Sequence, residues 1–124
     1  AVPLAVDTCD FLVFACDLTE DSHHLFDEST LVVLKPGVRV VNVSRGPLIK
    51  EAALLHGLSN GLISSAALDV FEVEPLAQTN EFLTHPKCIV GSHNGSNTID
   101  AVIRASHEAI RLLAAMLKEG ARSE

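Results

Sequence analysis

Residues 40–47 read Val-Val-Asn-Val-Ser-Arg-Gly-Pro. Most residues from 38 to 43 are β-branched, which is typical of a strand covered on both faces of a sheet. The strand ends on Arg45, and Gly46 and Pro47 turn the chain away. Parallel sheets bind ligands beyond the carboxyl ends of their strands, so Arg45 is placed where such a ligand lies. A solvated loop arginine is the alternative, and the rest of the chain favours the ligand site.

The composition indicates one globular domain with an aliphatic core. The chain has 124 residues, of which 48% are hydrophobic and 20% charged, and it contains no Trp or Tyr. A net charge of −7 without a basic cluster argues against nucleic acid or an anionic membrane as a partner. No apolar run approaches the roughly 20 residues that span a bilayer. We therefore expect neither a nucleic-acid partner nor a membrane.

The cysteines and the first residues of the chain bear on the location of the protein. Three cysteines, in no metal-ligand spacing, predict reduced thiols of a cytoplasmic protein without a disulfide or metal site. The first residues lack the basic region of a signal peptide and soon reach Asp7. The sequence does not begin with Met, so we expect it to belong to a longer protein.

Strand-like and helix-like segments alternate along the chain, which predicts right-handed crossovers and an α/β fold with a parallel sheet flanked by helices. The last helix should carry one apolar face, with Gly120 as its C′ residue. The predicted strands are 11–15, 38–43 continuing to Arg45, 62–70 and 87–91, and the predicted helices are 22–34, 50–59, one turn at 80–83, and 97–119. The residues expected on the apolar face of the last helix are Ile99, Val102, Ile103, Ala109, Ile110, Leu113, Met116 and Leu117.

Polar or ionisable residues that can bind a ligand or transfer a proton follow each predicted strand. They are Cys16-Asp17, Ser44-Arg45, the acidic stretch 69–74 and His93, and parallel strands bring all four exits to one rim. Arginine binds a carboxylate with a planar fork, and histidine exchanges a proton near neutral pH. A carboxylate beside the histidine fixes its orientation. This set suits hydride exchange between a carrier and a 2-hydroxy or 2-keto acid.

Four segments carry a family resemblance: CDLTEDSHHLFD, LKPGVRVVNVSRGPLIKEAAL, AALDVFEVEP and HPKCIVGSHNGSNT. In this order they resemble the D-isomer-specific 2-hydroxyacid dehydrogenases, the phosphoglycerate dehydrogenase-like group, from about Asp10 to the final helix. The resemblance implies that residues 1–124 are the second half of a Rossmann-type domain that binds NAD or NADP. It also implies a small 2-hydroxy or 2-keto acid as substrate and a homodimer as the complete protein.

The resemblance implies a role for each residue at the rim. Arg45 would hold the substrate carboxylate, His93 would be the acid/base at the 2-oxygen, and Glu74 would be its carboxylate partner. Asp69 would lie near the nicotinamide carboxamide. The family commonly has proline where Asp17 stands, which predicts altered contacts on the adenosine side. The residues expected on the cofactor side are Cys16, Asp17, Leu18, Thr19, Ser44, Arg45, Asp69, His93 and Gly95.

The glycine-rich loop that binds a dinucleotide pyrophosphate is not found in this sequence, since its seven glycines form no G-x-G-x-x-G. We expect that loop and the substrate domain to lie upstream. The strand beginning at Phe11 would then be an apolar edge. The chain by itself should bind NAD weakly or not at all and should self-associate.

Several residues have an alternative reading. We interpret His23 and His24 as surface residues at a helix start, and Glu72 competes with Glu74 for the carboxylate role.

Three interpretations of the whole chain stay open: an oxidoreductase on a small 2-hydroxy acid, a non-enzymatic NAD-sensing corepressor-like module, and a truncated product without activity. The first is preferred.

Overall fold

The computed structural model describes residues 6–120, with side chains to residue 118. The chain divides into two compact units, Ala1–His93 and Asn94–Glu124. Among the described residues, none of the helices combines the length and apolar character that crossing a membrane requires.

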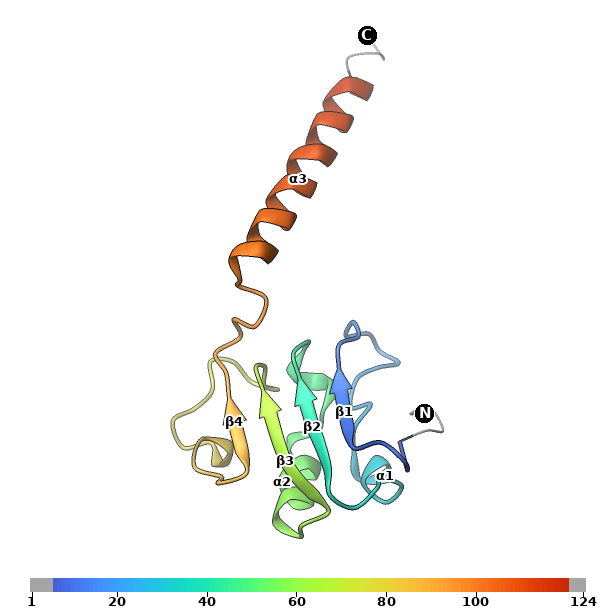
Figure 1. The fold of residues 1–124 in the computed structure, drawn as a ribbon, viewed down its shortest axis with the longest axis vertical. Helices are drawn as coiled ribbons and strands as arrows, with labels where there is room; N and C mark the ends of the chain where they lie inside the picture. The colour runs from blue at the N-terminus through green and yellow to red at the C-terminus, as the bar shows by residue number, and fades with distance from the viewer. Residues whose placement is uncertain (1–5, 121–124) are drawn as a thin grey trace. The chain divides into compact units, whose positions relative to one another are not determined.

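The first unit is built on a four-stranded sheet in the order β1-β2-β3-β4, and all neighbouring strands are parallel (Figure 1). The predicted α/β fold is therefore confirmed, with each strand somewhat shorter than expected. The strands are β1 Phe11–Phe14, β2 Val38–Asn42, β3 Ile63–Leu68 and β4 Cys88–Val90.

The last residues of the four strands lie in one row across the sheet. Phe14 pairs with Asn42, Asn42 with Leu68, and Leu68 with Val90. The chain consequently leaves all four strands at the same level and along the same edge. This confirms the expectation that the polar segments after the strands share one rim.

One face of the sheet is covered by α1 Glu28–Leu31 and α2 Glu51–Ser59, which lie behind it in Figure 1. The core on this side is aliphatic apart from a few phenylalanines, as the composition predicts. On the strands, side chains alternate between faces, and the other face carries Phe11, Val13 and Ile89, all well exposed. β1 is also an edge strand, so the predicted apolar edge at Phe11 is confirmed for the described residues.

The predicted helix at 22–34 is wrong except at Glu28–Leu31. Its apolar residues are nevertheless buried as expected, with Phe26, Leu31 and Leu34 in the core. The backbone at His24 and Phe26 instead pairs in parallel with the segment after β2. His24 N–H donates to Pro47 O (2.8 Å), and Phe26 N–H donates to Leu48 O (3.0 Å). A helix cannot form where these amides are already used.

The short helices follow local capping. Asp27 accepts from the backbone N–H groups of Ser29 and Thr30 and so begins α1. Asn80 accepts from Phe82 N–H and begins the 3₁₀ turn η2 Glu81–Leu83, where one helical turn was predicted. A second 3₁₀ turn, η1 Gly46–Leu48, follows Arg45 and leads to α2.

The second unit is dominated by α3 Ile99–Gly120, close to the predicted 97–119. Gly120 is its last residue, whereas the sequence predicted a C′ position just beyond the helix. The predicted apolar face is exposed in this unit, with Ile99 79% and Ile103 48% accessible at its extremes.

We predict that Phe26→Ala and Phe11→Ala differ sharply in their effect on the unfolding free energy of the 124-residue chain. Phe26 is fully buried and its truncation should cost about 3–5 kcal/mol, whereas Phe11 is 58% exposed on the bare face and should cost less than about 1 kcal/mol. Urea unfolding followed by circular dichroism measures both. Equal losses would mean that the Phe11 face is covered.

Candidate active site at the carboxyl edge of the sheet

Asn42 organises the turn that presents Arg45. Its side chain is 1% exposed, accepts from Ser44 N–H (3.1 Å) and donates to Arg45 O (2.9 Å). These two bonds end β2 at Asn42, three residues before the predicted end at Arg45. Sequence reasoning missed this residue, although a lone amide inside a β-branched run was a visible cue.

Arg45 lies on the rim beside the loop that follows β1. One guanidinium nitrogen donates to Ser44 O (2.7 Å), and the remaining donors are free to bind a ligand. Asp17, Leu18, Ser44 and Arg45 line an open hollow of about 420 Å³. The Ser44 hydroxyl donates to Cys16 O and ties the two loops together.

The turn at 16–19 is held by hydroxyl groups. Thr19 N–H donates to Ser22 Oγ (2.7 Å), and Ser22 Oγ in turn donates to Asp17 O (2.8 Å). The structure thus brings together the residues expected on the cofactor side after β1 and β2. Gly95, also expected there, belongs to the second unit.

His93 and Glu74 form a close pair. His93 Nδ1 lies 2.6 Å from Glu74 Oε2, and the two side chains are 45% and 31% exposed. His93 has φ 58°, and its backbone N–H donates to Asp69 O (2.8 Å), which fixes the histidine to the end of β3. Nδ1 is engaged by the carboxylate, so Nε2 is the nitrogen left to meet a substrate.

The charge state of Glu74 follows from its partners. Its hydrogen bond with His93 lowers the pKa of the Glu74 carboxyl below its ordinary value, while partial burial acts in the opposite direction. The Phe71 N–H, which donates to Glu74 Oε1 (2.9 Å), lowers the pKa further. Glu74 is therefore a carboxylate at neutral pH, suited to fix the orientation of the His93 ring.

The pair opens into a cavity of about 230 Å³ with a mainly apolar wall. Phe71, Leu76 and Val90 contribute that wall, and Asp69 lines it together with the pair. Gly91 permits the Asp69 side chain to lie here, since a Cβ at position 91 would stand 2.3 Å from Asp69 Oδ1. The acid/base candidates and Asp69 thus share one cavity, while Arg45 lines a separate hollow.

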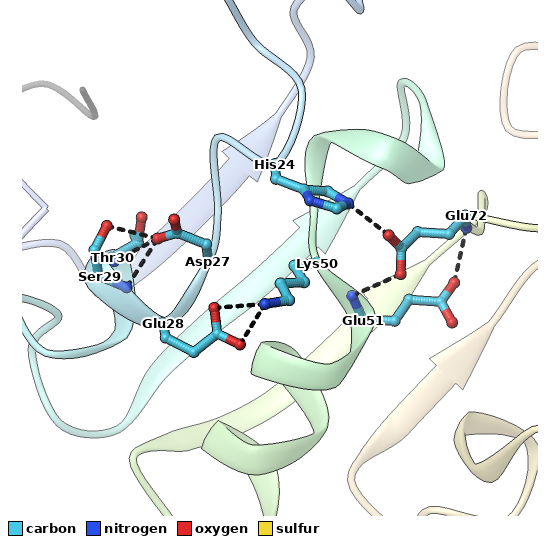
Figure 2. A network of polar contacts seen from close by, with 8 residues as sticks. All are labelled: His24, Asp27, Glu28, Ser29, Thr30, Lys50, Glu51 and Glu72. Atoms are coloured by element: carbon cyan, nitrogen blue, oxygen red, sulfur yellow. Dashed lines mark hydrogen bonds and ion pairs between the residues drawn. The ribbon is translucent and has the colours of Figure 1, made fainter.

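Glu72, the competing carboxylate, lies elsewhere. Its Oε1 is 2.6 Å from His24 Nε2, and its Oε2 accepts from Glu51 N–H (3.0 Å) (Figure 2). The expectation that His24 is a surface residue is thereby corrected, because it is half-buried and bonded to a residue 48 positions away. The pair could not be predicted from the sequence because its two residues lie far apart along the chain.

Comparison with known proteins gives the class of this fold and site. The family model "D-isomer specific 2-hydroxyacid dehydrogenase, NAD binding domain" matches residues 2–95. The chain belongs to this family, and the predicted resemblance and Rossmann-type fold are confirmed.

Curated relatives and solved structures agree with this assignment. The chain is 39% identical over 98 residues to D-3-phosphoglycerate dehydrogenase 3, chloroplastic, of Arabidopsis thaliana, covering 79% of this chain and 17% of that protein. It is 38% identical over 108 residues to glyoxylate/hydroxypyruvate reductase B of Enterobacter agglomerans, covering 87% and 33%. Apo D-mandelate dehydrogenase of Rhodotorula graminis superposes with a TM-score of 0.72 at 33% identity, covering 77% and 28%. The chain spans a third or less of the length of these proteins.

We predict that Glu74→Gln lowers the unfolding free energy by roughly 1 kcal/mol at neutral pH, in the low range for a charge-assisted bond because the pair is partly exposed. The folded pKa of Glu74 is below its ordinary value of 4.5, so its contribution is present above that value and is lost as pH falls through the lowered pKa. Denaturant unfolding across pH should show the gap between wild type and variant closing in acid. Glu20→Gln, at an exposed side chain, is the matched control for the substitution itself.

Proposed function

We propose that this chain supplies the catalytic part of an NAD(P)-dependent D-2-hydroxyacid dehydrogenase, an oxidoreductase that acts on the CH–OH group of a small acid. The observation that carries the proposal is the His93–Glu74 pair, with Nδ1 to Oε2 at 2.6 Å, in a cavity also lined by Asp69. The relatives reported above are named as dehydrogenases and reductases, which favours this function over the corepressor alternative.

His93 is the proton donor and acceptor at the 2-oxygen in this proposal. In the direction of reduction, its Nε2 gives a proton to the carbonyl oxygen as the carbon becomes CH–OH, and the imidazole becomes neutral. Glu74 holds the Nδ1 side, which fixes the orientation of the ring for the transfer. In the direction of oxidation, Nε2 takes the proton back.

Arg45 binds the substrate carboxylate in this proposal. Its guanidinium is permanently charged and retains donors beyond the one bonded to Ser44 O. Asn42 fixes the backbone from which it projects, so the anchoring charge is held on a rigid turn.

Bound NAD(P) supplies or accepts the hydride. The residues of this chain fit one side of such a ligand: the hollow beside Asp17, Leu18 and Ser44 lies at the carboxyl edge of a parallel sheet, where Rossmann-type domains bind dinucleotides. In this proposal Asp69, which lines the same cavity as His93 and Glu74, meets the carboxamide of the nicotinamide ring. The glycines of this sequence supply no pyrophosphate loop, so we assign that loop and the substrate domain to further residues of the native polypeptide.

The activity test uses the polypeptide at its native length, with NADH or NADPH oxidation measured against a panel of 2-keto acids. His93→Ala should lower kcat roughly 10²–10⁴-fold, because the proton donor is removed. Arg45→Ala should chiefly raise KM for the acid, by roughly 10- to 100-fold. His56→Ala and Arg39→Ala, at sites away from the proposed chemistry, serve as matched controls. Binding of NADH with no reduction of any panel member would support the non-enzymatic alternative.

The 124-residue chain by itself should bind NADH weakly or not at all and should self-associate. Within the part of the chain that the structure describes, the sheet exposes Phe11 and Val13 on one face and leaves one edge of β1 unpaired. Calorimetric titration and sedimentation velocity measure these two properties. A tight NADH complex of a monomeric chain would contradict the assignment of the phosphate loop to other residues.

Oligomeric state, partners and location complete the proposal. Small 2-hydroxy or 2-keto acids are the proposed substrates, and a homodimer is the proposed assembly of the complete enzyme. A cytoplasmic location rests on the three cysteines of the sequence without disulfide spacing. One relative is named as chloroplastic, so fractionation of the source cell is the direct measurement of location.

A further inference from the structure

Glu72 connects its own loop after β3 to the segment after β1 and to the start of α2 through one half-buried carboxylate. Its Oε1 contacts His24 Nε2 at 2.6 Å in the segment after β1, and its Oε2 accepts from Glu51 N–H (3.0 Å) at the start of α2. Its backbone N–H donates to Glu51 Oε1 (2.8 Å), so the two glutamates bond each other reciprocally. Figure 2 shows these contacts converging on Glu72.

The contact with α2 replaces a missing helix cap. Lys50, the N-cap residue of α2, makes no side-chain cap bond, and its ammonium pairs with Glu28 at 2.8 Å. The Glu72 carboxylate takes a free N–H at this end of the helix, where negative charge is also favoured by the helix dipole. The arrangement has the logic of a capping box, but its two halves come from different loops.

Glu51, the partner of Glu72, fixes the peptide that leads to Glu74. The Phe71–Glu72 peptide is constrained at both sides: its N–H is bonded to Glu51, and its carbonyl packs against Gly46, where a Cβ would stand 1.8 Å from the oxygen. Phe71 is the first residue of this peptide, and its own N–H donates to Glu74 Oε1. The orientation of Glu74 toward His93 therefore depends on a backbone that the Glu51 carboxylate holds, and Glu51 is in turn bonded through its N–H to the Glu72 side chain.

We infer that Glu72, anchored by Glu51 and His24, is a positioning residue that sets the Glu74 carboxylate against His93. The inference rests on the proposed function for its consequence in catalysis. Its geometric part, the dependence of Glu74 on Glu72, holds for this fold whatever the reaction. Glu72 itself lines neither of the two hollows at the rim, so it acts through Glu74.

The test compares Glu72→Ala with wild type in the native-length polypeptide. The first readout is the titration of the Glu74 carboxyl carbon by NMR after ¹³C labelling of glutamate, assigned with Glu74→Gln. The pKa of Glu74 is lowered chiefly by its bond to His93, so loss of that geometry should move the titration of Glu74 up toward 4.5. This readout does not require turnover and separates failure of the inference from failure of the proposed function.

The second readout is steady-state kinetics with the active 2-keto acid. Glu72→Ala should lower kcat roughly 10- to 100-fold, as expected for a displaced catalytic group, with KM changed less than threefold. Glu72→Gln keeps an acceptor for Glu51 N–H and should recover most of kcat. Glu28→Gln, which breaks the Lys50 pair in the same network, should leave both the titration and kcat at wild-type values.

The outcome that overturns the inference is a Glu72→Ala protein with reduced melting temperature but wild-type Glu74 titration and kcat, which would make Glu72 a helix cap only. If Glu72→Ala does not fold, His24→Ala decides the matter. It removes one Glu72 contact without disturbing the cap of α2, and it should shift the Glu74 titration in the same direction by a smaller amount. An unchanged titration in His24→Ala would then reject the positioning role.

Discussion

Backbone contact between Gly46 and Phe71 is the constraint on which the rim depends. A Cβ at position 46 would lie 1.8 Å from the Phe71 carbonyl oxygen and 2.5 Å from the Glu72 nitrogen, and neither backbone atom can rotate away. Arg45 directly precedes Gly46, and Glu74 follows Phe71 by three residues. The loop that carries Arg45, the proposed carboxylate anchor, is thereby packed against the loop that carries Glu74, the proposed partner of His93. Two groups with different proposed roles are held together without a direct side-chain contact between them.

The sheet could be predicted from the sequence because its information is local. Short β-branched runs separated by turn residues indicate buried strands, and alternation with helices fixes their parallel direction. The helix at 22–34 could not be predicted correctly for the opposite reason. The spacing of Leu25, Phe26 and Leu31 fits a helix, but the backbone of this segment bonds to residues 47–50, whose proximity no local pattern encodes.

The candidate site, like the fold, could be predicted where the information is local and could not be predicted where it depends on contacts between distant segments. The polar residues after each strand could be placed on one rim, since parallel strands end along one edge, and the choice of Glu74 over Glu72 agrees with the contact to His93. Asn42 and His24 were missed because their contribution lies in their partners. A buried amide that bonds two backbone groups, and a histidine paired with a carboxylate 48 residues away, become visible only when the loops are assembled.

The two halves of the proposed reaction have different structural requirements. The proton-transfer pair is complete within the first unit, because the strand ends, Gly46, Gly91 and the Glu51–Glu72 bonds all belong to it. Cofactor binding also needs a phosphate loop, and a parallel sheet needs cover on both faces. Here one face is bare at Phe11 and Val13, and the glycines form no such loop. Under the proposed function, one additional segment that packs on this face and edge would meet both needs, so the exposed apolar surface and the missing loop have a common explanation.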